Sequence, residues 1–272
     1  MIDIHCHILP GIDDGAQTFE TSLEMARIAV DEGVQTIVCT PHIMPGVFDN
    51  TPPDIRRRVA ELTRDLADKG IEIELMPGSD AHVRPDFVAA LRRDEIQPIG
   101  TGSYVLFEPP HNVAPPRLDE ILFNIRAAGW HPILTHPERL AWIEDRYDLV
   151  PELVHAGVLM QLTAASITGV FGERTRALSD RMLDEGLVHI VASDAHNTTR
   201  RSTRLRKAYA RCEELMGAEE AENLFVVRPH NVTLNTPIDL MPPLPAPRPR
   251  PSSAGIFKRL TSILQSNSVS RR

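Results

Sequence analysis

Apolar residues along the chain follow two alternating patterns. Short apolar runs predict strands at residues 1–5, 34–39, 71–76, 104–107, 131–134, 158–162 and 188–192. Longer stretches with helical spacing predict helices at 18–32, 54–69, 86–93, 118–128, 140–156 (one or two helices), 175–185, 205–216 and 218–224. Because strand and helix alternate seven times without a strand-only region, the pattern favours a parallel α/β fold.

Metal-binding residue types recur where the predicted strands end. His5 and His7 are two residues apart, which places both imidazoles on one face of a strand. The complete set of candidates is His5, His7, Asp14, His42, Asp80, Glu108, His136, Asp194 and His196. In a (β/α) barrel all strand ends meet on one face, whereas an open sheet collects ligands near one switch point. We therefore expect a closed or nearly closed seven-stranded (β/α)7 barrel, TIM-like but distorted.

Composition narrows the class of protein. The 272 residues are 42% hydrophobic and 24% charged, and no apolar run is long enough to span a membrane. The N-terminus enters a strand at once, and Cys6, Cys39 and Cys212 give no disulfide framework, so we expect a cytoplasmic protein. The net charge of −8 argues against binding of nucleic acid through phosphate neutralisation.

The C-terminal part differs from the rest of the chain. Six of the ten residues at 242–251 are proline, and residues 240–272 contain six Lys or Arg and no acid. We therefore place the barrel domain at 1–239 and expect 240–272 to be an extended, disordered, basic tail. The alternative is a short amphipathic helix around 256–264 that makes a peripheral contact with an anionic membrane or a partner.

The donor set indicates the kind of metal. A single histidine after a strand can cap a helix or lie in a core, but nine candidates at successive strand ends are hard to explain that way. Mixed imidazole and carboxylate ligands suit Mn²⁺, Fe or Zn²⁺ better than Mg²⁺ or Ca²⁺. Nine ligands exceed the needs of one or two ions, so we expect up to three.

Four sequence strings resemble a known family. They begin at His5 (HCHILPGIDDG), Thr40 (TPH), Thr135 (THPER) and Ala192 (ASDAHN). These strings are similar to the signatures of the polymerase-and-histidinol-phosphatase (PHP) superfamily. They resemble most its bacterial manganese-dependent protein tyrosine phosphatases of capsular and exopolysaccharide synthesis, over roughly residues 1–235. The resemblance implies the PHP variant of the barrel.

The resemblance also implies how three Mn²⁺ ions would be held. His5, His7 and Asp194 would bind the first ion, Glu108 and His136 the second, and Asp14, His42 and His196 the third. The family has a glutamate that bridges the first two ions where this chain has Asp80. Aspartate is shorter by one methylene, about 1.5 Å of reach, so the backbone moves inward or one ion is held weakly. His82 is a candidate substitute ligand.

Further residues are expected to act on a phosphoryl group. Arg139 and Arg201 match the positions where the family grips phosphate, with Arg200 as a competitor for the second role. Water activated by the cations would attack phosphorus, and the leaving tyrosine oxygen would take a proton from water, His42 or His111. No cysteine of the chain is followed by arginine six residues later, which excludes the Cys-x5-Arg type of phosphatase.

The resemblance therefore implies a metal-dependent phosphatase for a phosphotyrosine protein. The expected substrate is a membrane-associated bacterial tyrosine autokinase, through which the enzyme would regulate polysaccharide synthesis. Two alternatives remain: a small-molecule phosphoesterase of the histidinol-phosphatase type, and a non-catalytic metal-binding regulator. The sequence is also compatible with a homo-oligomer.

Overall fold

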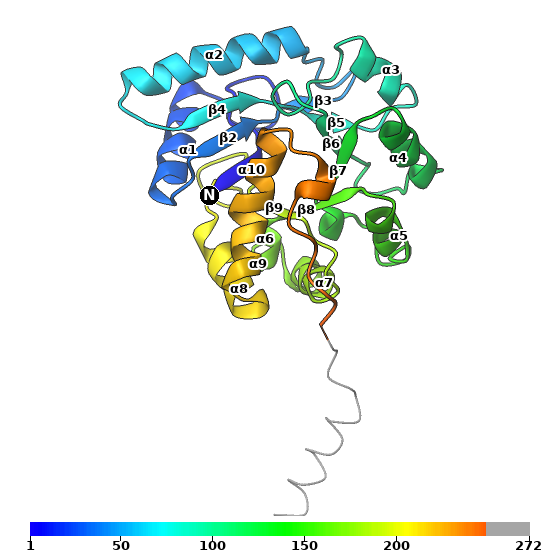
Figure 1. The fold of residues 1–272 in the computed structure, drawn as a ribbon. Coiled ribbons are helices and arrows are strands. Elements are labelled where there is room, and N and C mark those ends of the chain that lie inside the picture. The colour runs from blue at the N-terminus through cyan, green and yellow to red at the C-terminus, as the bar shows by residue number, and fades with distance from the viewer. Residues whose placement is uncertain (249–272) are drawn as a thin grey trace, which may run out of the picture.

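Parallel strands form the centre of the fold (Figure 1). The computed structural model describes residues 1–248. Its strands are β1 (Ile2–Cys6), β2 (Thr36–Cys39), β3 (His42–Ile43), β4 (Glu74–Pro77), β5 (Asp80–His82), β6 (Tyr104–Glu108), β7 (His131–Thr135), β8 (Leu159–Thr163) and β9 (Ile190–Ala192). They pair in the orders β1-β2-β4 and β3-β5-β6-β7-β8-β9. All pairs are parallel, which confirms the predicted α/β class.

The nine strands occupy only seven positions. β3 follows β2 after Thr40-Pro41, and β5 follows β4 after Gly78-Ser79, so each pair is one interrupted strand. At the other edge β1 meets β9, where the His7 amide donates to the Ala195 carbonyl at 2.9 Å and the Asp194 amide to the His5 carbonyl at 2.8 Å. The seven predicted strands are thus present in order. Their hydrogen bonding is divided between two sheets instead of running through one.

Helices pack around the strands (Figure 1). They are α1 (Phe19–Asp31), α2 (Pro52–Asp68), α3 (Phe87–Arg92), α4 (Leu118–Ala127), α5 (Leu149–His155), α6 (Ala164–Ile167), α7 (Glu173–Asp184), α8 (Arg206–Met216), α9 (Ala218–Glu222) and α10 (Arg228–Thr233). The side chains of Thr18 and Thr51 cap α1 and α2. No helix within residues 1–248 has both the length and the apolarity needed to cross a bilayer.

The helices of the structure differ from the predicted ones in three places. Only α5 forms within 140–156, and the residues before it make turns. There the Trp142 indole donates to the Pro110 carbonyl at 2.9 Å, and the Ala141 amide donates to the His111 carbonyl at 2.8 Å. Tertiary contacts with the loop after β6 thus replace the helix that apolar spacing indicated. The other two differences are α6 and α10, short helices that were not predicted.

A compact apolar cluster lies between the strands. It includes Ile4 of β1, Val38 of β2, Leu106 of β6, Ile133 of β7 and Ile190 of β9, all almost fully buried. Side chains from strands on opposite sides of the fold meet here, as they do in the filled interior of a (β/α) barrel. A larger cluster joins the outer faces of the strands to the helices.

The start of the proline-rich segment packs on this body. The buried Arg228 guanidinium donates to the carbonyls of Pro242 and Pro243, and the Arg248 amide donates to the Asp184 carbonyl at 2.7 Å. The domain limit after residue 239 stays a prediction, but residues 241–248 belong to the packed structure. The amphipathic helix considered for 256–264 lies outside the described residues.

Candidate metal centre

Two imidazoles of β1 point to one position. Nε2 of His5 and Nε2 of His7 are 3.2 Å apart, and both residues are buried. Each ring is held through its other nitrogen: His5 Nδ1 lies 2.8 Å from Gln161 Oε1, and His7 Nδ1 lies 2.8 Å from Asp13 Oδ2. Such contacts fix the tautomer and leave both Nε2 lone pairs available for a cation.

Asp13 connects several parts of the site. Its carboxylate accepts the His7 ring nitrogen and the backbone amides of Gly15 and His42. Although burial raises the pKa of Asp13, the interaction with His7 and the hydrogen bond from the Gly15 amide lower it below its ordinary value, so the carboxylate is ionised. The sequence analysis assigned no role to Asp13 or Gln161. The sequence signal for Asp13 was the Asp13-Asp14 pair that follows the two histidines. Gln161 gave no such signal, since it is 156 residues from His5 in the chain.

Asp194 follows β9 and faces the same position. Its Oδ1 is 3.5 Å from Nε2 of both His5 and His7. The residue has a φ of 50°, a left-handed conformation that costs free energy outside glycine and is common at functional sites. Arg139 and Arg201 both donate to its carboxylate. Despite burial, these charges and that of His5 hold the pKa of Asp194 well below its ordinary value.

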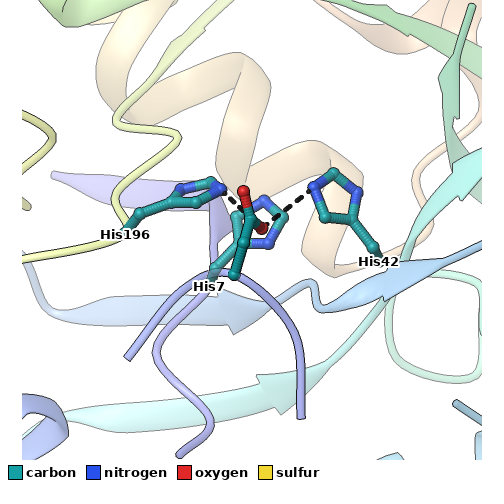
Figure 2. A group of neighbouring side chains, drawn as sticks. His7, His42 and His196 are labelled. Atoms are coloured by element: carbon teal, nitrogen blue, oxygen red, sulfur yellow. Dashed lines mark ion pairs between the residues drawn. The ribbon is translucent and has the colours of Figure 1, made fainter. Parts of the chain in front are cut away.

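A second group of side chains surrounds Asp14. His42 Nε2 lies 3.4 Å and His196 Nε2 3.2 Å from Asp14 Oδ1. Figure 2 shows the rings of His7, His42 and His196 turned toward one another around this carboxylate. Although burial opposes it, contacts with His196 and His42 lower the pKa of Asp14. The group His7, Asp14, His42 and His196 could hold one cation.

Glu108 at the end of β6 lies in two further groups. One joins it to His111 and His136, and the other to His42 and Asp80. Asp80 also lies in a group with His5 and His7, and its Oδ2 is 3.4 Å from His5 Nε2. All nine ligands predicted from the sequence therefore meet at one end of the strands. His111, which the sequence analysis considered only as a proton donor, joins them.

Buried atoms without hydrogen-bond partners indicate that something else belongs here. Both carboxylate oxygens of Asp80 and Nε2 of His196 are buried and make no hydrogen bond within the part of the chain that the structure describes. A buried unpaired polar atom is costly. Divalent cations would satisfy these oxygen and nitrogen donors, so the residues present fit a metal centre.

The charges of the histidines reflect these surroundings. Burial alone would lower the pKa of His5, but the carboxylates of Asp80 and Asp194 raise it to about 9. At His42, burial also lowers the pKa, but contacts with Asp14 and Glu108 outweigh this effect and raise the pKa to about 11. His196 has the opposite shift, because burial and the nearby His7 lower its pKa to about 4.

A pocket of 410 Å³ opens over the centre. Arg139 and Arg201 line it together with His42, Glu108 and His111. Arg200 instead donates to the Val170 carbonyl outside the pocket, so Arg201 is the better placed of the two competitors. The pocket thus combines a cation-binding floor with two guanidinium groups. This arrangement can hold an anion with several oxygens, such as a phosphoryl group.

Known proteins are similar to this chain in sequence and fold. A family model for capsular polysaccharide synthesis, CpsB/CapC, matches residues 1–234. Tyrosine-protein phosphatase YwqE of Bacillus subtilis is 35% identical over 219 residues, 80% of this chain and 86% of the relative. Tyrosine-protein phosphatase CpsB of Streptococcus pneumoniae is 30% identical over 243 residues, 86% of this chain and 99% of the relative.

Solved structures agree with these matches. One from work on YwqE and CpsB, described as unique metal-dependent tyrosine phosphatases, superposes with a TM-score of 0.85 at 34% identity, covering 91% of this chain and all of that chain. The lactonase Lmo2620 of Listeria monocytogenes, at 13% identity and a TM-score of 0.50, shares the fold alone. By sequence and by structure, the chain belongs to the CpsB/CapC family of capsular polysaccharide synthesis.

Proposed function

We propose that this protein is a metal-dependent tyrosine phosphatase that hydrolyses phosphotyrosine on proteins. One observation carries the proposal: buried imidazoles and carboxylates from six strand ends converge beneath a pocket lined by Arg139 and Arg201. Relatives that match most of the chain are named tyrosine-protein phosphatases, which supports the same activity. Divalent cations bound here would supply charge neutralisation and would lower the pKa of water.

We assign the ligands to three ions, with Mn²⁺ as the expected metal and Fe or Zn²⁺ as alternatives. The first would be held by His5, His7 and Asp194, the second by Glu108 and His136, and the third by Asp14, His42 and His196, with Asp80 between the first two. Close approach of the donor atoms within each set supports this assignment. Mixed nitrogen and oxygen donors are suited to these metals.

Two guanidinium groups of the chain would bind the substrate phosphate. Asp194 holds both Arg139 and Arg201 at the pocket, so their N–H groups are already oriented before substrate arrives. They would donate to the phosphoryl oxygens on which negative charge increases in the transition state. The tyrosine side chain would lie toward the pocket's apolar wall, which includes Phe48 and Val113.

The family supports a proposal for the biological substrate. We propose a phosphotyrosine protein of capsule or exopolysaccharide synthesis, specifically a membrane-associated tyrosine autokinase, and a cytoplasmic location for the enzyme. The openness of the metal pocket to the surface, where the side chain of Asp14 is 51% exposed, is compatible with a substrate that is itself a protein.

Hydrolysis of a phosphotyrosine peptide in the presence of Mn²⁺ tests the proposal. We expect turnover that a chelator abolishes and that falls at least ~1,000-fold in His5→Ala and Asp194→Ala, because each loses a direct ligand. His230→Ala, which changes an exposed histidine of α10, is the matched control. Preference for histidinol phosphate, or bound metal without any turnover, would contradict the proposal and favour the small-molecule phosphoesterase or the regulator, respectively.

A further inference from the structure

We propose that His111 is a ligand of the second metal ion, and that Glu108, His111 and His136 form a site selective for Zn²⁺ or Fe²⁺ over Mn²⁺. The inference rests on the proposed metallophosphatase function and changes the chemistry of one of its three metal positions. It assigns to His111 a role other than proton donation to the leaving group.

Three donor atoms are spaced as one ion requires. His111 Nε2 is 3.4 Å from Glu108 Oε1, and His136 Nε2 is 3.6 Å from the same oxygen. Two atoms that each bind one ion at 2.0–2.2 Å, at angles near 90–110°, are about 2.8–3.6 Å apart. The rings of His111 and His136 stack, with centroids 4.9 Å apart, and the Nε2 atoms of both lie near Glu108 Oε1.

The donor group of Glu108, His111 and His136 does not include Asp80, which the assignment above places between the first two ions. Asp80 falls into a group with His5 and His7 and into another with His42 and Glu108, but neither group contains His136. Its shorter side chain therefore leaves the second position with one carboxylate and one imidazole. His82, the substitute considered from the sequence, lies 3.5 Å from the other oxygen of Glu108 and joins none of the groups.

The backbone holds His111 in place for this role. The loop begins with Pro109-Pro110, whose φ angles are restricted. The Trp142 indole donates to the Pro110 carbonyl at 2.9 Å, and the Ala141 amide donates to the His111 carbonyl at 2.8 Å. The turns that replace the predicted helix before α5 thus anchor the histidine beside β6, and little conformational entropy is lost when it binds an ion.

The donor types determine the metal. Two imidazoles and one carboxylate are the set found in catalytic zinc sites and in mononuclear iron(II) sites. For one donor set, affinity rises from Mn²⁺ through Fe²⁺ to later metals, and exchange of a carboxylate for an imidazole favours the softer ions. The first position is more oxygen-rich, because Asp80 joins Asp194 there as a second carboxylate beside His5 and His7.

Metal binding to the purified, metal-stripped full chain tests the inference directly. Zn²⁺ and Mn²⁺ are titrated separately against a competing chelator, and bound ions are counted by elemental analysis. We expect His111→Ala to bind one Zn²⁺ fewer, or to bind that ion at least ~100-fold more weakly, because loss of a mere orienting partner already costs about 10–100-fold. His155→Ala, at an exposed position of α5, is the matched control.

A second variant separates ligation from other roles. His111→Glu keeps a donor but replaces nitrogen with oxygen, so we expect it to retain the ion and to lower the ratio of Zn²⁺ to Mn²⁺ affinity at least ~10-fold. With Co²⁺ as probe, the visible absorption bands should shift in both His111 variants and not in the control. The inference would be overturned if His111→Ala bound the same number of ions with unchanged affinity and altered only the pH profile of turnover. That result would identify His111 as a proton donor.

These measurements do not depend on turnover. Failure of the proposed function would appear as bound metal without phosphotyrosine hydrolysis in the unmodified protein. Failure of this inference would appear as wild-type metal binding in a His111→Ala protein that still hydrolyses phosphotyrosine.

Discussion

Two side chains that provide no ligand atom orient the histidine rings of β1. Asp13 and Gln161 each occupy the Nδ1 side of an imidazole and thereby direct Nε2 to the metal position. The spacing of His5 and His7 made the ligand pair predictable from the sequence. The partners were not predictable in the same way, because Gln161 reaches His5 only when β9 lies beside β1 and β8 pairs with β9.

Replacement of Asp13 by asparagine tests this role. We expect Asp13→Asn to weaken metal binding about 10–100-fold without unfolding the protein, since His7 loses the carboxylate that fixes its tautomer. Chelator competition measures the affinity, and near-ultraviolet circular dichroism monitors the fold. The control is Asp65→Asn on the exposed face of α2. Equal metal affinity in both variants would contradict the role of Asp13.

His189 gives the fold a dependence on pH that is separate from the metal centre. Its Nδ1 accepts the Met160 amide at 3.1 Å, so the ring is neutral. Burial, and secondarily the Arg228 charge, lower its pKa to about 3. An unfolded histidine has a pKa near 6.5. Between these values the unfolded chain binds a proton that the folded protein does not, so stability decreases as pH falls below about 6.5.

We expect this loss to be no more than about 1.4 kcal/mol per pH unit, the limit for one proton. His189→Gln keeps an acceptor for the Met160 amide but cannot titrate. Denaturant unfolding of the metal-stripped protein at several pH values from 7 to 4.5 should therefore give a shallower slope for the variant. Parallel pH curves for the two proteins would show that His189 is protonated in the folded state.

At the scale of elements, two interrupted strands carry much of the site. The sequence predicted that strands end at residues 39 and 76, because a proline and a glycine follow closely. The structure continues both as β3 and β5, which contain His42, Asp80 and His82. The two short strands pair with each other, with His42 opposite Asp80. Apolar patterning could not reveal them, because they are two and three residues long and consist mainly of functional side chains.

Gly78 permits this arrangement. A Cβ atom added there would lie 2.6 Å from Val38 Cγ1 and 3.1 Å from Thr40 Cγ2. We expect Gly78→Ala to push the junction between β4 and β5 away from β2, to destabilise the protein by about 1–3 kcal/mol and to weaken metal binding through Asp80. Thermal unfolding and chelator competition measure the two effects. Wild-type values for both would show that Gly78 is not needed for the close approach.

For the whole molecule, alternation of strands and helices correctly predicted the parallel α/β class and the order of seven strand positions. The convergence of ligands was also predictable, because in this class the strand ends meet on one face. The division into two sheets and the packing of residues 241–248 could not be predicted from the sequence. Both depend on contacts between distant residues, such as Arg228 with Pro242 and Pro243, that no local pattern records.

Arg228 joins the last described residues to the base of the fold. Its guanidinium makes an ion pair with Glu220, and the arginine side chain is 1% exposed. Since loss of one partner leaves an uncompensated buried charge, we expect Glu220→Gln to destabilise the protein by about 3–5 kcal/mol. Metal affinity should remain unchanged, because the pair lies at the opposite end of the strands from the metal centre. Denaturant unfolding and metal titration test both parts.

Glu219→Gln, one position earlier on α9 and exposed, is the control for this change. A loss of metal affinity in Glu220→Gln that equals its loss of stability would show that the two ends of the fold are coupled.

The positions of the two described chain ends have a practical consequence. The Met1 ammonium donates to the Gly33 carbonyl, which precedes β2, and the Arg248 amide donates to the Asp184 carbonyl, which precedes β9. Both ends thus leave the protein where the strands start, while the pocket opens where they finish. A bead, sensor chip or fusion partner attached at the N-terminus would leave the pocket mouth facing outward, accessible even to a bulky phosphoprotein.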